Sequence, residues 1–170
     1  MTLLDAGALA GDWTLDLAQS TIRLATKSVW GLVKVNGSFG DISGSGIITP
    51  DGKASGVLTV AATSIDTANA KRDKHLKSKD FFHVEKHPEI TYTATAVTTT
   101  GDSAMVEGTL TVIGNSRRLT VPATVTAADG TVTLDATVPV NRKDFGMSFN
   151  QLGMMGSDNT LTIHAVFTRA

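Results

Sequence analysis

The sequence predicts an all-β protein, an extended antiparallel β-barrel with a short helix and with long loops at its open end. Apolar and polar residues alternate with a period of two along most of the chain, as in LTVPATVTA (119–127) and TVTLDATVPV (131–140). Turn-forming residues separate such runs at TPDG (49–52), TGD (100–102) and ADG (128–130). Closing many strands into a barrel removes the exposed edges of the sheet, which favours a barrel over a sandwich.

Nine strands account for the alternation. Threonine and valine are frequent in them, and both residues suit a pleated strand with one buried and one solvated face. In order, the strands are expected near residues 12–17, 20–27, 32–49, 54–63, 89–99, 104–113, 117–127, 131–140 and 160–168.

Proline and glycine predict local irregularities within these strands. Pro122 and Pro139 cannot donate a backbone hydrogen bond, so each should mark an edge or a bulge. The GSG at 44–46 lacks the third glycine and the helix of a dinucleotide-binding fingerprint, and a bend or bulge explains it better.

The side chains assigned to the inner face are mostly small. Alternation places Ile90, Tyr92, Ala94 and Ala96 on one face, and Tyr92 and Phe167 are the bulky exceptions among Ala, Val and Leu. The interior of an eight-stranded barrel is only just filled by large side chains, so small ones favour a cavity that holds a ligand.

Strand order separates the connections between two ends of the barrel. If the strands run up and down in sequence, the tight turns share one end, and the long or irregular connections (28–31, 71–92, 114–118 and 141–159) share the other. An apolar lid rimmed by cations suits an amphiphilic ligand with an anionic head, and the alternative is a set of loops that cap a packed barrel. The second end gathers ten of the fifteen basic residues together with Trp30, Phe81, Phe82, Phe145, Met147, Phe149, Met154 and Met155.

A short helix is expected at the start of the long connection. Asn69 is a suitable N-cap, and AKRDKHLKS contains few residues that disfavour a helix. Leu76 should face the barrel, and Arg72 and Asp73 share its face at helical spacing. These two charged side chains need partners, which are each other, nearby backbone or the head of a ligand.

The segment HVEKH (83–87) allows one metal hypothesis. If it is extended, His83, Glu85 and His87 lie on one face and resemble a catalytic zinc arrangement. The alternative is an exposed polar lead-in to the strand after Pro88. His75 and His164 are isolated in the sequence, and an isolated histidine is more often structural or exposed than catalytic.

Composition limits the remaining possibilities. A net charge of −1 argues against a nucleic-acid-binding protein, and the absence of cysteine excludes disulfides and thiolate chemistry. No phosphate-binding loop or nucleophile elbow is present, so no enzyme is predicted. No apolar run approaches the length of a membrane span, and MTLLDAGALAGDW lacks the basic start of a secretory signal. We expect a cytoplasmic protein with an N-terminal tail (1–11) and one domain (12–170).

Three motifs carry a resemblance to a known family. They are SIDTANAKRDKHLKSKDFFHVEKHPEITY (64–92), GTLTVIGNSRRLTVP (108–122) and RKDFGM (142–147), and the match spans about residues 12 to 170. The chain resembles the YceI-like family of lipocalin-like, polyisoprenoid-binding barrels. Gln19 and Lys27 are departures, because relatives commonly place histidine there.

The resemblance implies a tunnel for a long isoprenoid, ligand binding without catalysis or a cofactor, and pairing as a homodimer. From the family motifs, Arg72, Asp73, His75, Leu76, Phe81 and Phe82 would form the lid, with Arg142, Phe145 and Gly146 opposite. The complete set of expected ligand-binding residues is Trp30, Arg72, Asp73, His75, Leu76, Phe81, Phe82, Tyr92, Arg142, Phe145, Met147 and Phe149.

The sequence therefore predicts a carrier or sequestering protein for a long-chain amphiphilic lipid, such as a polyisoprenoid or an isoprenoid quinone. Two alternatives stay open at this point. One is a metal-dependent enzyme that uses His83, Glu85 and His87. The other is a packed barrel that binds no ligand and acts as a stress-response or interaction module.

Overall fold

The computed structural model describes residues 8–28, 33–78, 81–128, 130–145 and 155–170. All strand pairings in it are antiparallel. The elements are β1 (Gly11–Leu15), η2 (Leu17–Gln19), β2 (Thr21–Ser28), β3 (Val33–Phe39), β4 (Ile42–Ile48), β5 (Ala54–Ala61), η3 (Ala62–Ser64), β6 (Ile65–Asp66), α1 (Ala70–Leu76), β7 (Glu89–Thr100), β8 (Ser103–Val112), β9 (Asn115–Ala128), β10 (Thr131–Asn141), η4 (Arg142–Phe145) and β11 (Met155–Arg169).

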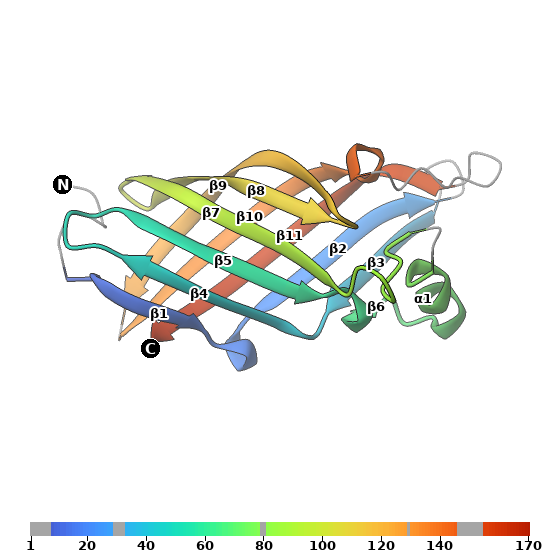
Figure 1. Ribbon diagram of the computed structural model, residues 1–170, viewed down its shortest axis with the longest axis horizontal. Helices are drawn as coiled ribbons and strands as arrows, with labels where there is room; N and C mark the ends of the chain where they lie inside the picture. The colour runs from blue at the N-terminus through green and yellow to red at the C-terminus, as the bar shows by residue number, and fades with distance from the viewer. Residues whose placement is uncertain (1–7, 29–32, 79–80, 129, 146–154) are drawn as a thin grey trace.

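The sheet closes into an eight-stranded barrel (Figure 1). Neighbouring strands follow the order β1-β4-β5-β7-β8-β9-β10-β11, and β1 also pairs with β11 to complete the ring. Farther along β11, residues 159–164 pair with β2 instead, and β3 and β6 continue the wall from there. The predicted barrel is confirmed, and the pairing of β1 with β11 closes the ring.

The first two strands are not joined by a turn, which corrects the expected alternation. Both β1 and β2 run antiparallel to β11, so they follow one path that η2 interrupts. The side chain of Asp16 begins this short helix by accepting a hydrogen bond from the backbone N–H of Ala18 at 3.0 Å. The strand expected at 32–49 is likewise one path, broken at Gly40 and Asp41 into β3 and β4.

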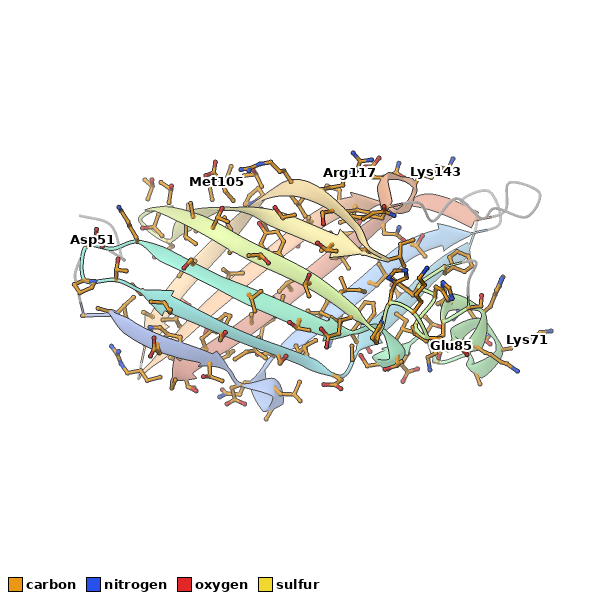
Figure 2. All side chains as sticks on the ribbon, viewed as in Figure 1. Asp51, Lys71, Glu85, Met105, Arg117 and Lys143 are labelled. Atoms are coloured by element: carbon orange, nitrogen blue, oxygen red, sulfur yellow. The ribbon has the colours of Figure 1, made fainter. Side chains whose placement is uncertain are left out.

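The two ends of the barrel differ as strand order predicted. Figure 1 shows α1 and η4 at one end, and the chain termini with the β4–β5 and β7–β8 turns at the other. We call the first the mouth end and define it by residues 65–89, 113–118 and 142–145. The labelled side chains in Figure 2 follow this division, with Lys71 and Glu85 at the mouth end and Asp51 at the far turn.

The far end is plugged by a compact apolar cluster around Trp13. Its indole lies 3% exposed and donates a hydrogen bond from Nε1 to the carbonyl of Leu9 at 2.8 Å. The other buried members of this cluster are Ile48, Ala104, Val125 and Val132.

Glycines bring the strands together next to this plug without a bulge. Gly46 pairs with Gly56 in a register that runs unbroken from Ile42 to Ile48, so of the bend or bulge expected at 44–46 the bulge is absent. A Cβ atom at Gly56 would lie 2.5 Å from the carbonyl oxygen of Ser45. These glycines serve close approach of the two backbones instead.

A bulge occurs where the sequence does not indicate one. The β7–β8 register shifts between Ala94 and Ala96, which leaves Thr95 as the extra residue. Ala94 faces the interior, whereas Ala96 lies opposite exposed Glu107 and Val97 lines the inside. The expected inward position of Ala96 is therefore wrong.

The two prolines lie where the wall loses hydrogen bonds. Pairing between β9 and β10 stops at Ala123 and Ala136, although β9 reaches back to Asn115 and β10 continues to Asn141. Pro122 still pairs with β8 and Pro139 with β11, and neither has a partner on the side between β9 and β10. The edge expected at both prolines is confirmed.

Candidate functional site: an apolar tunnel

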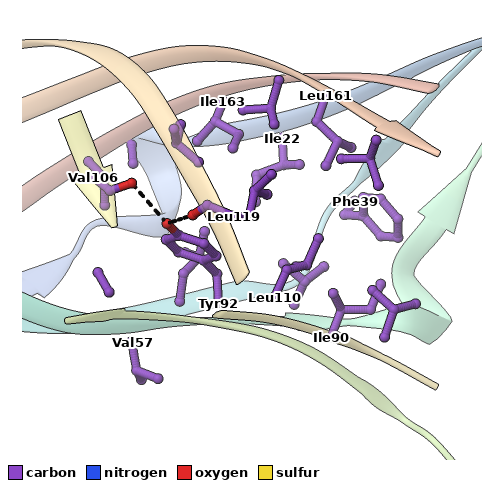
Figure 3. A pocket seen from close by; sticks show the side chains of 18 of the residues that line it. Ile22, Phe39, Val57, Ile90, Tyr92, Val106, Leu110, Leu119, Leu161 and Ile163 are labelled. Carbon is purple, nitrogen blue, oxygen red and sulfur yellow. Dashed lines mark hydrogen bonds between the residues drawn. The ribbon is translucent and has the colours of Figure 1, made fainter. Parts of the chain in front are cut away.

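The barrel encloses a cavity of about 570 Å³ that extends along most of its length. At the far end its lining begins at Trp13 and Val132, and at the mouth end it reaches Arg72 and His75. Most of the lining is aliphatic. Figure 3 shows Ile90, Leu110, Leu119, Leu161 and Ile163 around this space.

The inner side chains retain solvent-accessible surface although they face the barrel interior. Leu58, Ala94, Leu134 and Ile163 are only half-buried, yet each lines the cavity. In a packed core such residues would be almost completely inaccessible. The interior is therefore hollow, as the small inner residues predicted.

Tyr92 lies flat against the wall of the tunnel. Its ring covers Gly108, where a Cβ atom would lie 2.8 Å from the ring carbon Cζ. The hydroxyl donates to the carbonyl of Leu119 at 2.7 Å, and the Val106 carbonyl lies 3.3 Å away (Figure 3). Burial raises the pKa of Tyr92, and the nearby Glu107 carboxylate adds to the effect. The phenol thus stays neutral at physiological pH and keeps donating.

Helix α1 lies at the mouth end and is held there by hydrogen bonds to Thr67. Asn69 caps it, as predicted, by accepting a hydrogen bond from the N–H of Arg72 at 3.0 Å. Leu76 packs against the main apolar cluster, which confirms that this side of the helix faces the barrel.

Thr67 forms hydrogen bonds with both charged residues on the inner side of α1. Its N–H and its hydroxyl donate to Oδ1 of Asp73 at 3.0 and 2.5 Å. Its hydroxyl and carbonyl oxygens accept from Nε and Nη2 of Arg72 at 2.8 and 2.7 Å. Of the partners expected for Arg72 and Asp73, the structure shows nearby protein groups, namely the backbone and the side chain of Thr67. Arg72 also lines the cavity.

The lid aromatics are buried at the mouth end. Phe81, Phe82 and Phe145 are less than 9% exposed, and all three line the cavity. The ring of Phe82 meets that of Phe39 edge-on at 6.1 Å, and Phe81 meets His75 at 5.1 Å. Edge-to-face pairs of this kind hold aromatic rings in a fixed orientation.

Hydrogen bonds join the far side of the mouth to β9. The side chain of Asn115 donates to the carbonyl of Phe145 at 2.7 Å, and Arg117 Nε donates to that of Asp144 at 2.9 Å. These two hydrogen bonds connect η4 to β9 at the mouth end of the stretch in which β9 and β10 do not pair. Trp30, Met147 and Phe149 lie outside the described residues, and so does the side chain of Arg142.

The metal hypothesis required residues 83–87 to be extended, and this expectation is wrong. The backbone turns there, because the N–H groups of Lys86 and His87 both donate to the carbonyl of His83. The rings of His83 and His87 meet edge-on at 5.9 Å. Within the part of the chain that the structure describes, no three His, Asp or Glu side chains are grouped to hold a metal ion.

Several lining residues were not singled out from the sequence. Ile22, Leu24 and Phe39 come from β2 and β3, Leu58 and Val60 from β5, and Thr67 from the loop before α1. Strand alternation would identify the apolar ones. The anchoring role of Thr67 has no local sequence pattern, because its two partners follow five and six residues later on a helix.

The fold and the tunnel agree with a known family. A family model described as the YceI-like domain matches residues 13–167. The chain belongs to the YceI-like family. A UPF0312 protein of Pseudomonas aeruginosa (strain LESB58) is 37% identical over 128 residues, which cover 71% of this chain and 65% of that protein. The chain thus spans slightly less than two thirds of that relative. Protein YceI of Escherichia coli O157:H7 is 42% identical over 66 residues, 39% of this chain and 35% of that protein.

Solved structures of similar fold superimpose closely. The crystal structure of Burkholderia cenocepacia BcnA gives a TM-score of 0.82 at 25% identity and covers 89% of this chain and 98% of that one. A polyisoprenoid binding domain from Saccharophagus degradans, implicated in plant cell wall breakdown, gives 0.76 and covers 93% and 98%. At 14% identity the second likeness shows the fold alone. None of the helices that the structure describes is long and apolar enough to cross a membrane.

Proposed function

We propose that this YceI-like barrel binds a long-chain amphiphilic lipid of isoprenoid type, as a carrier or a sequestering protein. The observation that carries the proposal is the hollow apolar interior, in which inner side chains such as Leu58, Leu134 and Ile163 are only half-buried. A solved structure of similar fold, described as a polyisoprenoid binding domain, supports the same class of ligand.

The dimensions of the tunnel suit a chain of moderate length. Its lining spans eight residue steps on β10, from Val132 to Val140, and eight on β11, from Asn159 to Phe167. At about 3.3 Å per residue on strands tilted about 40°, this is roughly 20 Å along the axis. An extended chain with bonds of about 1.5 Å advances about 1.25 Å per bond, so about 16 carbons in line, or about four isoprene units, would fit.

The energy of burial is sufficient for tight binding. Four isoprene units contain about 20 carbons, and at about 0.8 kcal/mol each their burial would contribute at most about 16 kcal/mol. Ordering of the flexible tail and loss of translational freedom offset a large part of this. The free energy that remains still favours binding, but burial of the tail distinguishes poorly among tails of similar width.

The head group would lie at the mouth end, beside Arg72 and His75. Thr67 occupies two of the five N–H donors of Arg72, and the other three have no partner among the described residues. These donors suit an oxygen-rich or anionic head. Asn159 and Thr26 are further polar residues in the lining near this end.

A binding protein explains these features better than the two alternatives. The turned segment at 83–87 removes the geometry on which the metal-dependent enzyme depended. A packed interaction module does not require a cavity of about 570 Å³. Pairing as a homodimer and a cytoplasmic location stay predictions.

Native mass spectrometry of freshly purified protein, followed by organic extraction, tests the proposal. A discrete added mass that matches a prenyl, quinone or fatty species would support it and name the ligand class. A mass equal to that of the chain alone, unchanged after incubation with polyprenyl and fatty lipids, would refute it.

A further inference from the structure

Charged side chains are distributed unevenly along the barrel. Among those that the structure describes, the mouth end carries eight basic and five acidic residues, a balance of +3. The remaining described side chains include three basic and seven acidic ones, a balance of −4. The mouth-end charges are Lys71, Arg72, Lys74, Lys77, Lys86, Arg117, Arg118 and Lys143, against Asp66, Asp73, Glu85, Glu89 and Asp144.

The cations of the mouth end project into solvent from three separate segments. Lys71 and Lys74 on α1, Lys86 before β7, Arg118 on β9 and Lys143 on η4 are all exposed. Figure 2 shows Lys71, Arg117 and Lys143 on the side of the molecule away from Asp51. The segments surround the same end, so the charge forms a rim and not a single strip.

Among the residues that the structure describes, no carboxylate forms an ion pair with these cations. The ion pairs between described side chains join Lys53 to Asp51 and His164 to Asp135, and both pairs lie away from the mouth end. Two mouth-end carboxylates are already engaged, because Asp73 accepts from Thr67 and Asp66 accepts from the N–H of Ala68 at 2.9 Å. The positive field at this end is therefore open to a partner.

We propose that the basic rim of the mouth end docks the protein on an anionic lipid bilayer, with the tunnel entrance toward the membrane. Each basic residue near such a surface strengthens binding about five-fold, and the attraction extends for about 10 Å at moderate salt. The acidic remainder of the barrel is repelled by the same surface, so the charge asymmetry also orients the molecule.

The position of the tunnel selects a membrane over other anionic partners. The cavity lining extends to Arg72 and to the exposed His75, inside the rim, so docking would bring this end of the tunnel to the source of amphiphiles. An overall charge of −1 with an acidic body does not suit the long backbone of a nucleic acid. This purpose of docking rests on the proposed lipid-binding function, whereas docking itself depends only on the surface charge.

Co-sedimentation with vesicles tests docking directly. The probes are vesicles of phosphatidylcholine alone and vesicles that also contain phosphatidylglycerol, at low and at moderate salt. The wild-type protein should prefer the anionic vesicles and should release them as salt rises.

Two double variants with equal charge change separate the rim from the rest. Lys74→Glu with Arg118→Glu alters two exposed rim residues that do not line the cavity, and it should weaken binding at least about 25-fold. Arg23→Glu with Lys53→Glu alters two exposed residues outside the mouth end, and binding should change less than about 5-fold. No preference of the wild type for anionic vesicles, or an equal loss in both double variants, would overturn the proposal.

A separate loading assay keeps the two proposals distinguishable. An alkyl-chain fluorophore in vesicle-free buffer reports whether the tunnel accepts a tail, and both double variants should load it like the wild type. Docking without loading would refute the lipid-binding function and leave the rim assignment standing. Loading without docking would refute the rim assignment alone.

Discussion

Closing the tunnel at its middle is the sharpest test of the proposed ligand site. Ala94 faces the cavity halfway along its stretch of β7 lining, between Ile90 near the mouth and Val97 near the plug. It pairs with Gly56 on one side and, on the other, with Gly108, which the ring of Tyr92 covers, so neither paired residue adds a side chain of its own to the tunnel. Ala94→Phe would place a ring across the path of the tail.

The expected loss follows from the length of the tunnel. A block at its middle leaves room for about half of the tail, so about eight carbons would lose burial at about 0.8 kcal/mol each, or about 6 kcal/mol. The shorter bound segment also costs less to order, which recovers part of this. A net loss of about 3 kcal/mol corresponds to a reduction in affinity of about a hundredfold.

Stability should move in the opposite direction or not at all. The new ring fills an existing space and buries apolar surface, so the free energy of unfolding should be unchanged or slightly higher. A thermal melt therefore separates blocked binding from unfolding. The affinity is measured with a fluorescent alkyl probe, and the retained lipid is measured by native mass spectrometry.

The bulge at Thr95 provides a matched control. Ala96→Phe introduces the same side chain two residues away, but Ala96 lies opposite Glu107 on the outer face. This variant should retain lipid like the wild type. Undiminished binding by Ala94→Phe, or an equal loss in both variants, would refute the assignment of the tunnel as the tail site.

Three further predictions follow from the contacts. Thr67→Val removes the hydroxyl shared by Arg72 and Asp73, so the free energy of unfolding in denaturant titration should fall by about 2–3 kcal/mol, against less than about 0.5 kcal/mol for exposed Thr63→Val. Tyr92→Phe should cost about 1 kcal/mol at neutral pH. Because the folded-state pKa of Tyr92 is raised, that stabilisation is complete below pH about 10 and is lost as pH rises through the folded-state pKa, so urea titrations of both proteins should converge there. Backbone amides in the unpaired stretches of β9 and β10 should exchange hydrogen faster than those in their paired stretches, and equal protection would contradict an open ladder.

Much of the barrel could be predicted from the sequence because its strands obey the period-two rule. The inner face of β11, the edge at both prolines and the N-cap at Asn69 all follow from local chemistry. The bulge at Thr95 and the close approach at Gly56 could not be predicted, because both depend on which residue of a neighbouring strand lies opposite. Register is a property of the pair of strands, and a single sequence does not contain it.

The site was harder to predict than the fold, for the same reason. Arg72 and Asp73 were recognised as charges on the apolar side of a helix, but whether a ligand or the protein satisfies them depends on the loop that reaches them. Thr67 reaches both, and it uses its hydroxyl, its N–H and its carbonyl to do so. A charged pair beside a cavity is thus partly structural, and only the remaining donors of Arg72 are available to a head group.

Selectivity in such a tunnel must come from its two ends. The aliphatic wall contributes affinity in proportion to buried area and does not distinguish one tail of similar width from another. The plug at Trp13 sets the depth that any tail can reach, and a chain longer than about four isoprene units must leave its excess outside the mouth. That excess would lie at the mouth end, beside Arg72 and His75, the polar residues of the lining that face the head of a shorter ligand. Chain length and head-group chemistry are therefore coupled at the mouth end, so affinity should rise with tail length up to this limit and then level off.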